Sequence, residues 1–331
     1  MTADRLRSIV PMFGGGTNYV ETLDATLEFV ESHTPTTDEL VGWYRGTFDR
    51  VSSRTSIMRR VSYLRRVGFI NLDGERWRLD AAGREYARDY DLETLLRIMC
   101  TRNVGLRSLL YELAAGPMSI EAISKQQLNT HAELGWSPGE TDMALQRTNW
   151  LRSMGLVEKR SNGYALTDAG HEFVDGAVAD WTEIAWTPES ADDSMIADTY
   201  ETTVQARVVD QEFRDAALAR YDEKCPVSGV DHAGLLDVAH ILSWSEYPSY
   251  RADLKNVLPL SKTHHAAFDR ELFTIDQEFR LRVNPTFDTE SNMLQQTIIN
   301  KAGERVPVSE ETLDSEYLAR HNASLKWMSH A

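Results

Sequence analysis

The 331-residue sequence predicts an α+β protein of several domains, in which two copies of a helix–hairpin–helix unit precede a strand–strand–helix unit. Three observations lead to this prediction: a gapless internal repeat, a hairpin turn signal inside each copy, and apolar runs bounded by glycine and proline in the last third of the chain. We therefore expect domains at residues 1–90, 91–176 and 206–331, with an acidic connector at residues 177–205.

The internal repeat relates two segments that lie 87 residues apart. Residues 60–86 align with residues 147–173 without a gap, so that YLRRVGFI from Tyr63 corresponds to WLRSMGLV from Trp150. In the first copy Gly68 ends a helix, Asp73-Gly74 is a hairpin turn signal, and Asp80 begins the next helix. The equivalent residues of the second copy are Gly155, Asn162-Gly163 and Thr167. This layout resembles the winged helix-turn-helix domains that are common in DNA-binding proteins, and it implies two tandem winged-helix domains.

The helix before each hairpin carries the candidate DNA-binding side chains. At 100° per residue, Ile57, Val61 and Leu64 share a buried stripe of the first helix. The outward residues are then Arg59, Ser62, Tyr63 and Arg66 in the first copy and Gln146, Asn149, Trp150 and Ser153 in the second. Arginine suits phosphates and guanine edges, and amides pair with adenine, so the candidate readers are Arg59, Arg66, Gln146 and Asn149. Tyr63 and Trp150 are expected to be partly buried supports. The alternative is a dimerisation or spacer role for these domains, with a merely solvated arginine face.

The C-terminal unit consists of two apolar runs and a helix. Residues 235–241 are expected to form one strand, and residues 256–260 a second, which Pro259 confines to an edge. A helix follows from about His264 to Leu272. His265 and Asp269 are four residues apart, so their side chains project from one face of this helix and can bind one cation together. His240, at the end of the first strand, faces the helix across the hairpin.

These residues, in this order, resemble an HNH endonuclease of the ββα-metal type found in restriction enzymes. The resemblance covers roughly residues 209–285 and rests on Phe213-Arg214, Cys225-Pro226-Val227-Ser228-Gly229, Ala239-His240-Ile241, Asn256, His265 and Phe268-Asp269-Arg270. It implies that His240 is the general base that takes a proton from water, and that Asn256 braces the hairpin. It also implies that His265, with Asp269, binds a divalent cation, Mg²⁺ or Mn²⁺, which neutralises charge on the scissile phosphate and the leaving 3′ oxygen. An imidazole, with an unperturbed pKa of about 6.5, suits the role of base near neutral pH.

Two features depart from the family pattern. Many members carry a metal-binding Asp or His directly before the base, where this chain has Ala239. Asp237 is the nearest carboxylate and therefore a further candidate metal ligand, although strand alternation sends it to the face opposite His240. Many members also contain a four-cysteine zinc site. The chain has only two cysteines, so no structural zinc is expected. The alternative for the two histidines is a pair of core residues satisfied by the backbone, and for Asp269-Arg270 a helix ion pair.

Composition and charge set the remaining expectations. With 42% hydrophobic and 26% charged residues the composition is ordinary for globular proteins. The start lacks a signal-peptide pattern, and no apolar run approaches the roughly 20 residues that span a bilayer, so we expect a soluble, cytoplasmic protein without a membrane partner. The net charge of −16 is unexpected for a DNA-binding protein. Because only seven of the 35 basic residues are lysines, the composition resembles that of salt-loving microbes, where molar salt shortens the Debye length to about 3 Å. The alternative is an acidic protein that binds no nucleic acid.

Together these features predict a metal-dependent endonuclease acting on double-stranded DNA, of the restriction type, with or without dependence on a modified base. Since a one-metal HNH site cuts one strand per encounter, double-strand cleavage would call for a homodimer or repeated nicking. The alternative function is a DNA-binding regulator with an inactive HNH domain. A third, an RNA-directed or toxin-like nuclease, is disfavoured by the tandem winged helices.

Overall fold

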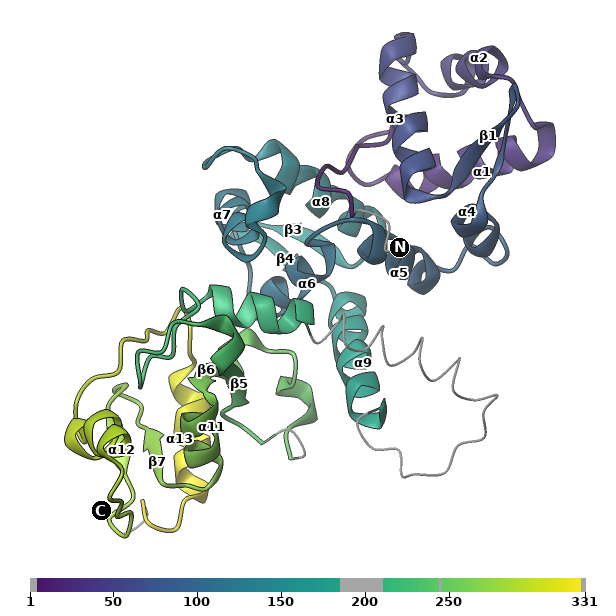
Figure 1. Ribbon diagram of the computed structural model, residues 1–331. Helices are drawn as coiled ribbons and strands as arrows, with labels where there is room; N and C mark the ends of the chain where they lie inside the picture. Colours follow the sequence, from purple (N-terminus) through teal and green to yellow (C-terminus); the bar gives the residue numbers. More distant parts are fainter. Residues whose placement is uncertain (1–4, 185–210, 244–245, 329–331) are drawn as a thin grey trace. The chain divides into compact units, whose positions relative to one another are not determined.

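The computed structural model describes residues 5–184, 211–243 and 246–328, and the chain divides into two compact units, residues 1–171 and 172–331 (Figure 1). Both copies of the internal repeat, apart from the last two residues of the second, lie in the first unit, so the boundary expected at residue 90 falls inside it. The expected acidic connector begins within helix α9, and its part from residue 185 onward lies outside the described residues.

The first unit contains two successive sets of helices, each followed by a two-stranded antiparallel hairpin. The first set comprises α1 (Tyr19–His33), α2 (Thr37–Thr47), α3 (Arg54–Val67), β1 (Ile70–Asp73), β2 (Arg76–Leu79) and α4 (Ala81–Tyr86). The second comprises α5 (Leu92–Arg102), α6 (Leu106–Ala114), α7 (Ile120–Thr130), the single turn η1 (Ala132–Leu134), α8 (Asp142–Ser153), β3 (Val157–Arg160) and β4 (Gly163–Leu166). The helix after this hairpin, α9 (Asp168–Ile184), begins in the first unit and continues into the second. The expected helix–hairpin–helix order is confirmed in both copies, whereas their assignment as winged-helix domains stays a prediction.

Glycines are required at matching positions of the two copies. Gly68, with φ of 100°, ends α3 in the left-handed conformation that glycine adopts without strain. A Cβ atom at Gly83 would lie 1.9 Å from the carbonyl oxygen of Phe69, and one at Gly170 would lie 2.2 Å from that of Leu156. Only glycine therefore lets the helix after each hairpin pack directly against the residue that leads into the first strand.

The expectation that this face of α8 points to solvent is wrong. Trp150 is completely buried, and its Nε1 donates to the carbonyl oxygen of Val10 at 3.0 Å. Asn149 is only 8% exposed, and Gln146 accepts a hydrogen bond from the Tyr19 hydroxyl at 2.7 Å. The first turn of α1 and the segment before it cover much of this face, so that Asn149 is buried and Gln146 is half-buried.

The equivalent face of α3 is different. Tyr63 is buried and donates to the Asn103 side chain at 3.0 Å, so it agrees with the expected buried support and is not an outward residue. Arg59, Ser62 and Arg66 are exposed, as the apolar stripe predicts. The two copies thus share a buried aromatic residue, but only the first presents a polar helix face to solvent.

The second unit is built on the expected strand–strand–helix order. The antiparallel strands β5 (Leu236–His240) and β6 (Val257–Ser261) pair with His240 opposite Val257, and α11 (Lys262–Asp269) packs against both. The remaining elements are a helix over residues 211–219, the hairpin of β7 (Phe273–Ile275) and β8 (Leu281–Val283), α12 (Asn292–Thr297), α13 (Ser315–Ser324), and the single turns η2 (Ala233–Leu235), η3 (Pro248–Tyr250), η4 (Leu254–Asn256) and η5 (Ile299–Lys301). The core between them includes Ala239, Leu258, Leu260, Phe268 and Phe273.

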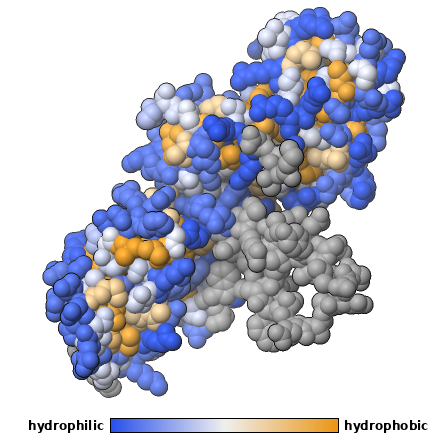
Figure 2. Space-filling model, viewed as in Figure 1, coloured by the Kyte–Doolittle hydropathy of each residue, from blue (hydrophilic) through white to orange (hydrophobic). Residues whose placement is uncertain are grey.

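The surface is largely polar, as expected for a globular protein. Hydrophilic residues predominate on the face of the molecule shown in Figure 2. Across the described residues, no helix combines the length and the apolar character that crossing a membrane requires.

Candidate active site

The order of elements brings the three predicted site residues into one region. His240 is the last residue of β5, Asn256 directly precedes β6, and His265 lies on the first turn of α11, which begins where β6 ends. His240 and His265 are close enough that His265 influences the protonation of His240 electrostatically.

The His240 ring bonds to a backbone carbonyl and lies parallel to a neighbouring aromatic ring. Its Nε2 lies 2.9 Å from the carbonyl oxygen of Arg251, and its plane is within 7° of that of Phe213, with ring centroids 6.2 Å apart. Because a carbonyl can only accept, Nε2 carries the hydrogen, and the neutral ring keeps its lone pair on Nδ1. Burial lowers the pKa of His240 below its ordinary value of 6.5. The neutral, proton-accepting form therefore predominates at neutral pH.

Asn256 ties together the two ends of the loop that follows His240. The side chain is completely buried; its Oδ1 accepts from the backbone N–H of Leu242 at 2.9 Å, and its Nδ2 donates to the carbonyl oxygens of Tyr250 (3.0 Å) and Leu242 (3.4 Å). This amide satisfies backbone groups from both sides of the loop. It is therefore placed to support the loop residue whose carbonyl orients His240.

The Asn256→Asp variant is expected to lower the free energy of unfolding of this unit by about 2–4 kcal/mol, because a buried carboxylate would face the two carbonyl oxygens that now receive the amide hydrogens. Denaturant unfolding of the purified protein measures the change. The control is Asn300→Asp, the same substitution at an exposed position of the same unit. Equal stability of the two variants would contradict the bracing role.

His265 lies between two carboxylates. Its Nδ1 is 3.7 Å from Asp237 Oδ2, and its Nε2 is 3.4 Å from Asp269 Oδ2. Strand alternation separates Asp237 from His240, as expected, but α11 crosses β5 and brings His265 to Asp237. The histidine side chain is 26% exposed and both carboxylates are more exposed, so solvent and substrate can reach the group.

The side chains of His265, Asp237 and Asp269 fit a divalent cation that is also bound by oxygen atoms of the substrate. Each side of His265 offers one ring nitrogen and one carboxylate oxygen, but the two ring nitrogens point to different sides. Among the residues that the structure describes, no three His, Cys, Asp or Glu side chains are grouped to hold a metal ion. Mg²⁺ commonly binds through one or two carboxylates, retained waters and substrate phosphate oxygens, so a closed protein site is not needed.

Two further histidines of this unit have local structural roles. His264 is completely buried, with Nδ1 2.8 Å from Ser261 Oγ and Nε2 2.9 Å from Thr297 Oγ1, and burial lowers its pKa to about 4. It links α11 to α12 as a neutral ring. The exposed His232 accepts a hydrogen bond from the backbone N–H of Gly234 at 3.2 Å, next to the short turn η2.

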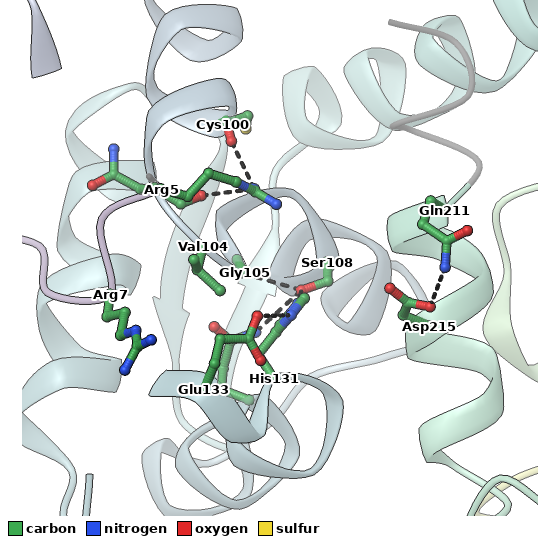
Figure 3. Close-up of polar contacts among 12 residues, drawn as sticks. Arg5, Arg7, Cys100, Val104, Gly105, Ser108, His131, Glu133, Gln211 and Asp215 are labelled. Carbon is green, nitrogen blue, oxygen red and sulfur yellow. Dashed lines mark hydrogen bonds and ion pairs between the residues drawn. The ribbon is translucent and has the colours of Figure 1, made fainter. Parts of the chain in front are cut away.

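In the first unit, a cluster around His131 contains the chemical groups of a hydrolase triad, but its serine is not accessible to a substrate (Figure 3). Ser108 Oγ lies 2.8 Å from His131 Nε2, and His131 Nδ1 lies 3.6 Å from Glu133 Oε1. Nucleophilic catalysis requires the hydroxyl to meet a substrate carbonyl. Ser108 is completely buried and also bonds to the carbonyl oxygen of Gly105 at 3.2 Å. We therefore regard this cluster as a buried polar network that joins α6 to η1.

The comparisons with known proteins agree with the geometry of the second unit. Residues 225–276 match the family model described as HNH endonuclease, HNH_2, and this range contains His240, Asn256, His265 and Asp269. The match supports an HNH nuclease module in this part of the chain, generally hydrolytic and acting on DNA. HNH nucleases generally depend on a divalent metal ion. A comparison with curated proteins found no match.

Proposed function

Starting from the HNH endonuclease match at residues 225–276, we propose that the protein is a divalent-metal-dependent DNA endonuclease of the restriction type, guided to double-stranded DNA by tandem winged-helix domains. The observation that carries this proposal is the pairing of an oriented, neutral imidazole, His240, with a second imidazole, His265, that lies between two carboxylates. A general base beside a cation site is the minimum apparatus for hydrolysis of a phosphodiester.

His240, Asn256 and His265 have separate roles in the proposed reaction. His240 Nδ1 accepts a proton from the attacking water, and the Arg251 carbonyl holds the ring in the tautomer that leaves this nitrogen basic. Asn256 holds the loop in place. His265, with Asp237 or Asp269, would bind Mg²⁺ or Mn²⁺. The bound cation supplies positive charge to the scissile phosphate and the leaving 3′ oxygen. Since one site cuts one strand, cleavage of both strands would use a homodimer or successive nicks.

Cleavage should remain fast at a lower pH than an ordinary histidine base would allow. Burial lowers the pKa of His240, protonation removes its lone pair, and activity is therefore lost only as the pH falls through a value below 6.5. The measurement is the pH dependence of the single-turnover cleavage rate, with the metal concentration kept saturating at each pH. An acid limb centred above 6.5 would contradict the assignment of the base.

DNA contact is best assigned to α3. Arg59 and Arg66 are exposed two turns apart on one side of this helix, and within the described residues neither forms an ion pair. On α8, Asn149 is buried, and Gln146 is half-buried and bonded to Tyr19. The side chains of α3 are therefore more accessible to DNA. Local arginine is needed because the net charge of −16 opposes the approach of a polyanion.

Replacing Arg59 or Arg66 with alanine is expected to weaken binding to duplex DNA several-fold at about 0.1 M salt and to reduce the slope of log affinity against log salt by about one per arginine. Fluorescence anisotropy over a range of KCl concentrations measures both quantities. Arg88→Ala removes the same charge from an exposed position between α4 and α5 and should leave the slope nearly unchanged. Equal effects of all three substitutions would mean that α3 has no special part in binding.

A further inference from the structure

A tyrosine and an arginine lie together on the surface beside the candidate site. Tyr250 is in the loop that joins β5 to β6, directly before the residue whose carbonyl oxygen is bonded to His240. Arg320 is exposed on α13; its Nη1 donates to the Tyr250 hydroxyl at 3.3 Å, and its Cζ is 5.8 Å from the centre of the Tyr250 ring. The guanidinium group is thus held against the loop that orients the general base.

The Tyr250 side chain and backbone are held in turn by neighbouring residues. The centre of its ring is 5.0 Å from that of Tyr317, whose hydroxyl donates to Asp253 Oδ2 at 2.7 Å. The carbonyl oxygen of Tyr250 accepts a hydrogen bond from Asn256 Nδ2 at 3.0 Å. Because its support is already in place, Arg320 loses less side-chain freedom on binding a ligand than an unsupported arginine would.

Arg320 is a positive charge in an acidic part of the chain. Residues 211–331 contain 19 acidic and 13 basic side chains, so a DNA strand that approaches this unit needs basic side chains at particular places. Among the described residues Arg320 forms no ion pair, and Glu316, one turn earlier on α13, acts on it only through its charge. Arg320 can therefore donate to a phosphate oxygen without first leaving a carboxylate.

The orientation of His240 shows on which side of the base this arginine lies. His240 Nε2 faces the loop that carries Tyr250, whereas Nδ1, on the other side of the ring, is the nitrogen left to accept a proton. The reacting phosphate has to lie on the Nδ1 side. Arg320, on the side of the loop, is therefore placed for a phosphate farther along the strand.

We propose that Arg320, supported by the Tyr250 ring, binds a backbone phosphate of the cleaved strand outside the scissile bond, a contact that rests on the proposed nuclease function. The contact holds the strand in register over His240 and His265 and does not touch the reacting atoms. It contributes to DNA affinity and carries no base preference of its own, because every nucleotide presents the same phosphate.

The test neutralises phosphates one at a time. Duplex DNA, with its bound region mapped by footprinting and its cut bond mapped with wild type, is made with a single uncharged methylphosphonate at successive positions. Affinity is measured by fluorescence anisotropy with Mg²⁺ in the His240→Ala background, which keeps the DNA intact. We expect Arg320→Ala to weaken binding several-fold at about 0.1 M salt and to lower the slope of log affinity against log salt by about one. One methylphosphonate should weaken binding only when Arg320 is present.

Two further variants separate the contact from a general loss of charge or structure. Tyr250→Phe keeps the ring but removes the hydroxyl that holds the guanidinium group, so its affinity should lie between those of the parent and Arg320→Ala. Arg305→Ala is the matched control, because it removes an exposed arginine of the same unit that also lies over an aromatic ring, that of Phe279. It should keep the affinity of the parent and its sensitivity to every methylphosphonate.

Three results would overturn the proposal. They are equal affinities of Arg320→Ala and the parent, a weaker affinity with unchanged sensitivity to every methylphosphonate, and a coupling of Arg320 to the scissile phosphate itself. A wild type that binds DNA and cleaves none would remove the proposed nuclease function, whereas the coupling between Arg320 and one phosphate would still be measured. Absence of DNA binding by the wild type would remove both.

Discussion

Replacement of His240 by alanine is expected to lower the rate of DNA cleavage by about 10²–10⁴-fold, the usual contribution of a general base, and to leave the affinity for DNA unchanged. The expectation follows from the position of the ring: its Nε2 is engaged by the Arg251 carbonyl, and burial keeps it neutral, so that Nδ1 can accept the proton of the attacking water. Single-turnover cleavage and DNA binding, measured on the same preparations, separate the two effects.

The control for this variant is His171→Ala, which removes an exposed imidazole from the start of α9 and should leave cleavage unchanged. His240 is also packed against Phe213, so the unfolding temperature of His240→Ala should be recorded beside its activity. A variant that folds normally and still cleaves at the wild-type rate would show that another group takes the proton. Loss of DNA binding in that variant would also argue against a role as base.

Replacement of His265 by alanine is expected to lower metal-supported cleavage by about 10³-fold, because a divalent cation contributes several kcal/mol of charge stabilisation that depends on its being held in place. The concentration of Mg²⁺ or Mn²⁺ that supports half-maximal cleavage should rise as well. A titration of cleavage against metal concentration measures both effects, and removal of metal with EDTA should abolish the activity of the wild type. The exposed His232, replaced by alanine, is the control within the same unit.

The two carboxylates beside His265 can be distinguished in the same titration. Asp237 faces Nδ1 at 3.7 Å and Asp269 faces Nε2 at 3.4 Å, so a cation on one side of the ring uses only one of them. Whichever of Asp237→Asn and Asp269→Asn raises the metal requirement more identifies the side that binds. If neither variant and no change at His265 altered the metal requirement, the cation would have to bind elsewhere.

The arrangement of β5, β6 and α11 was largely predictable because its signals are local. An apolar strand ending at His240, a second strand after Asn256 and a helix with His265 and Asp269 four residues apart follow one another within 34 residues, and short connections leave few ways to arrange them. The contact between His265 and Asp237 was not predictable in this way. Alternation along the strand shows which face Asp237 occupies, but not that α11 crosses that face.

In the first unit, helical periodicity predicted which residues share a face of α8 but not that this face is covered. Helical periodicity marks Arg59 on α3 and Gln146 on α8 as equivalent, and the repeat supports that equivalence. The covering of α8 comes from the segment around Val10 and from Tyr19, which lie more than 120 residues away in the chain. A period identifies the residues that share a face, whereas the partner of that face depends on tertiary contacts.

The bond between His240 and the Arg251 carbonyl gave no sequence signal either. Arg251 lies in a loop without periodicity, and any residue could supply a backbone carbonyl. The position of this loop depends on Asn256 and on the bond between Tyr317 and Asp253.

The most direct test of the account is a cleavage assay of wild type and His240→Ala with Mg²⁺ or Mn²⁺, on modified and unmodified duplex DNA, at KCl concentrations from low to molar. The range of salt is needed because the net charge of −16 opposes DNA binding when screening is weak. We predict discrete fragments from the wild type and none from His240→Ala. Binding of DNA without strand scission under every one of these conditions would contradict the account and indicate a DNA-binding regulator with an inactive HNH domain.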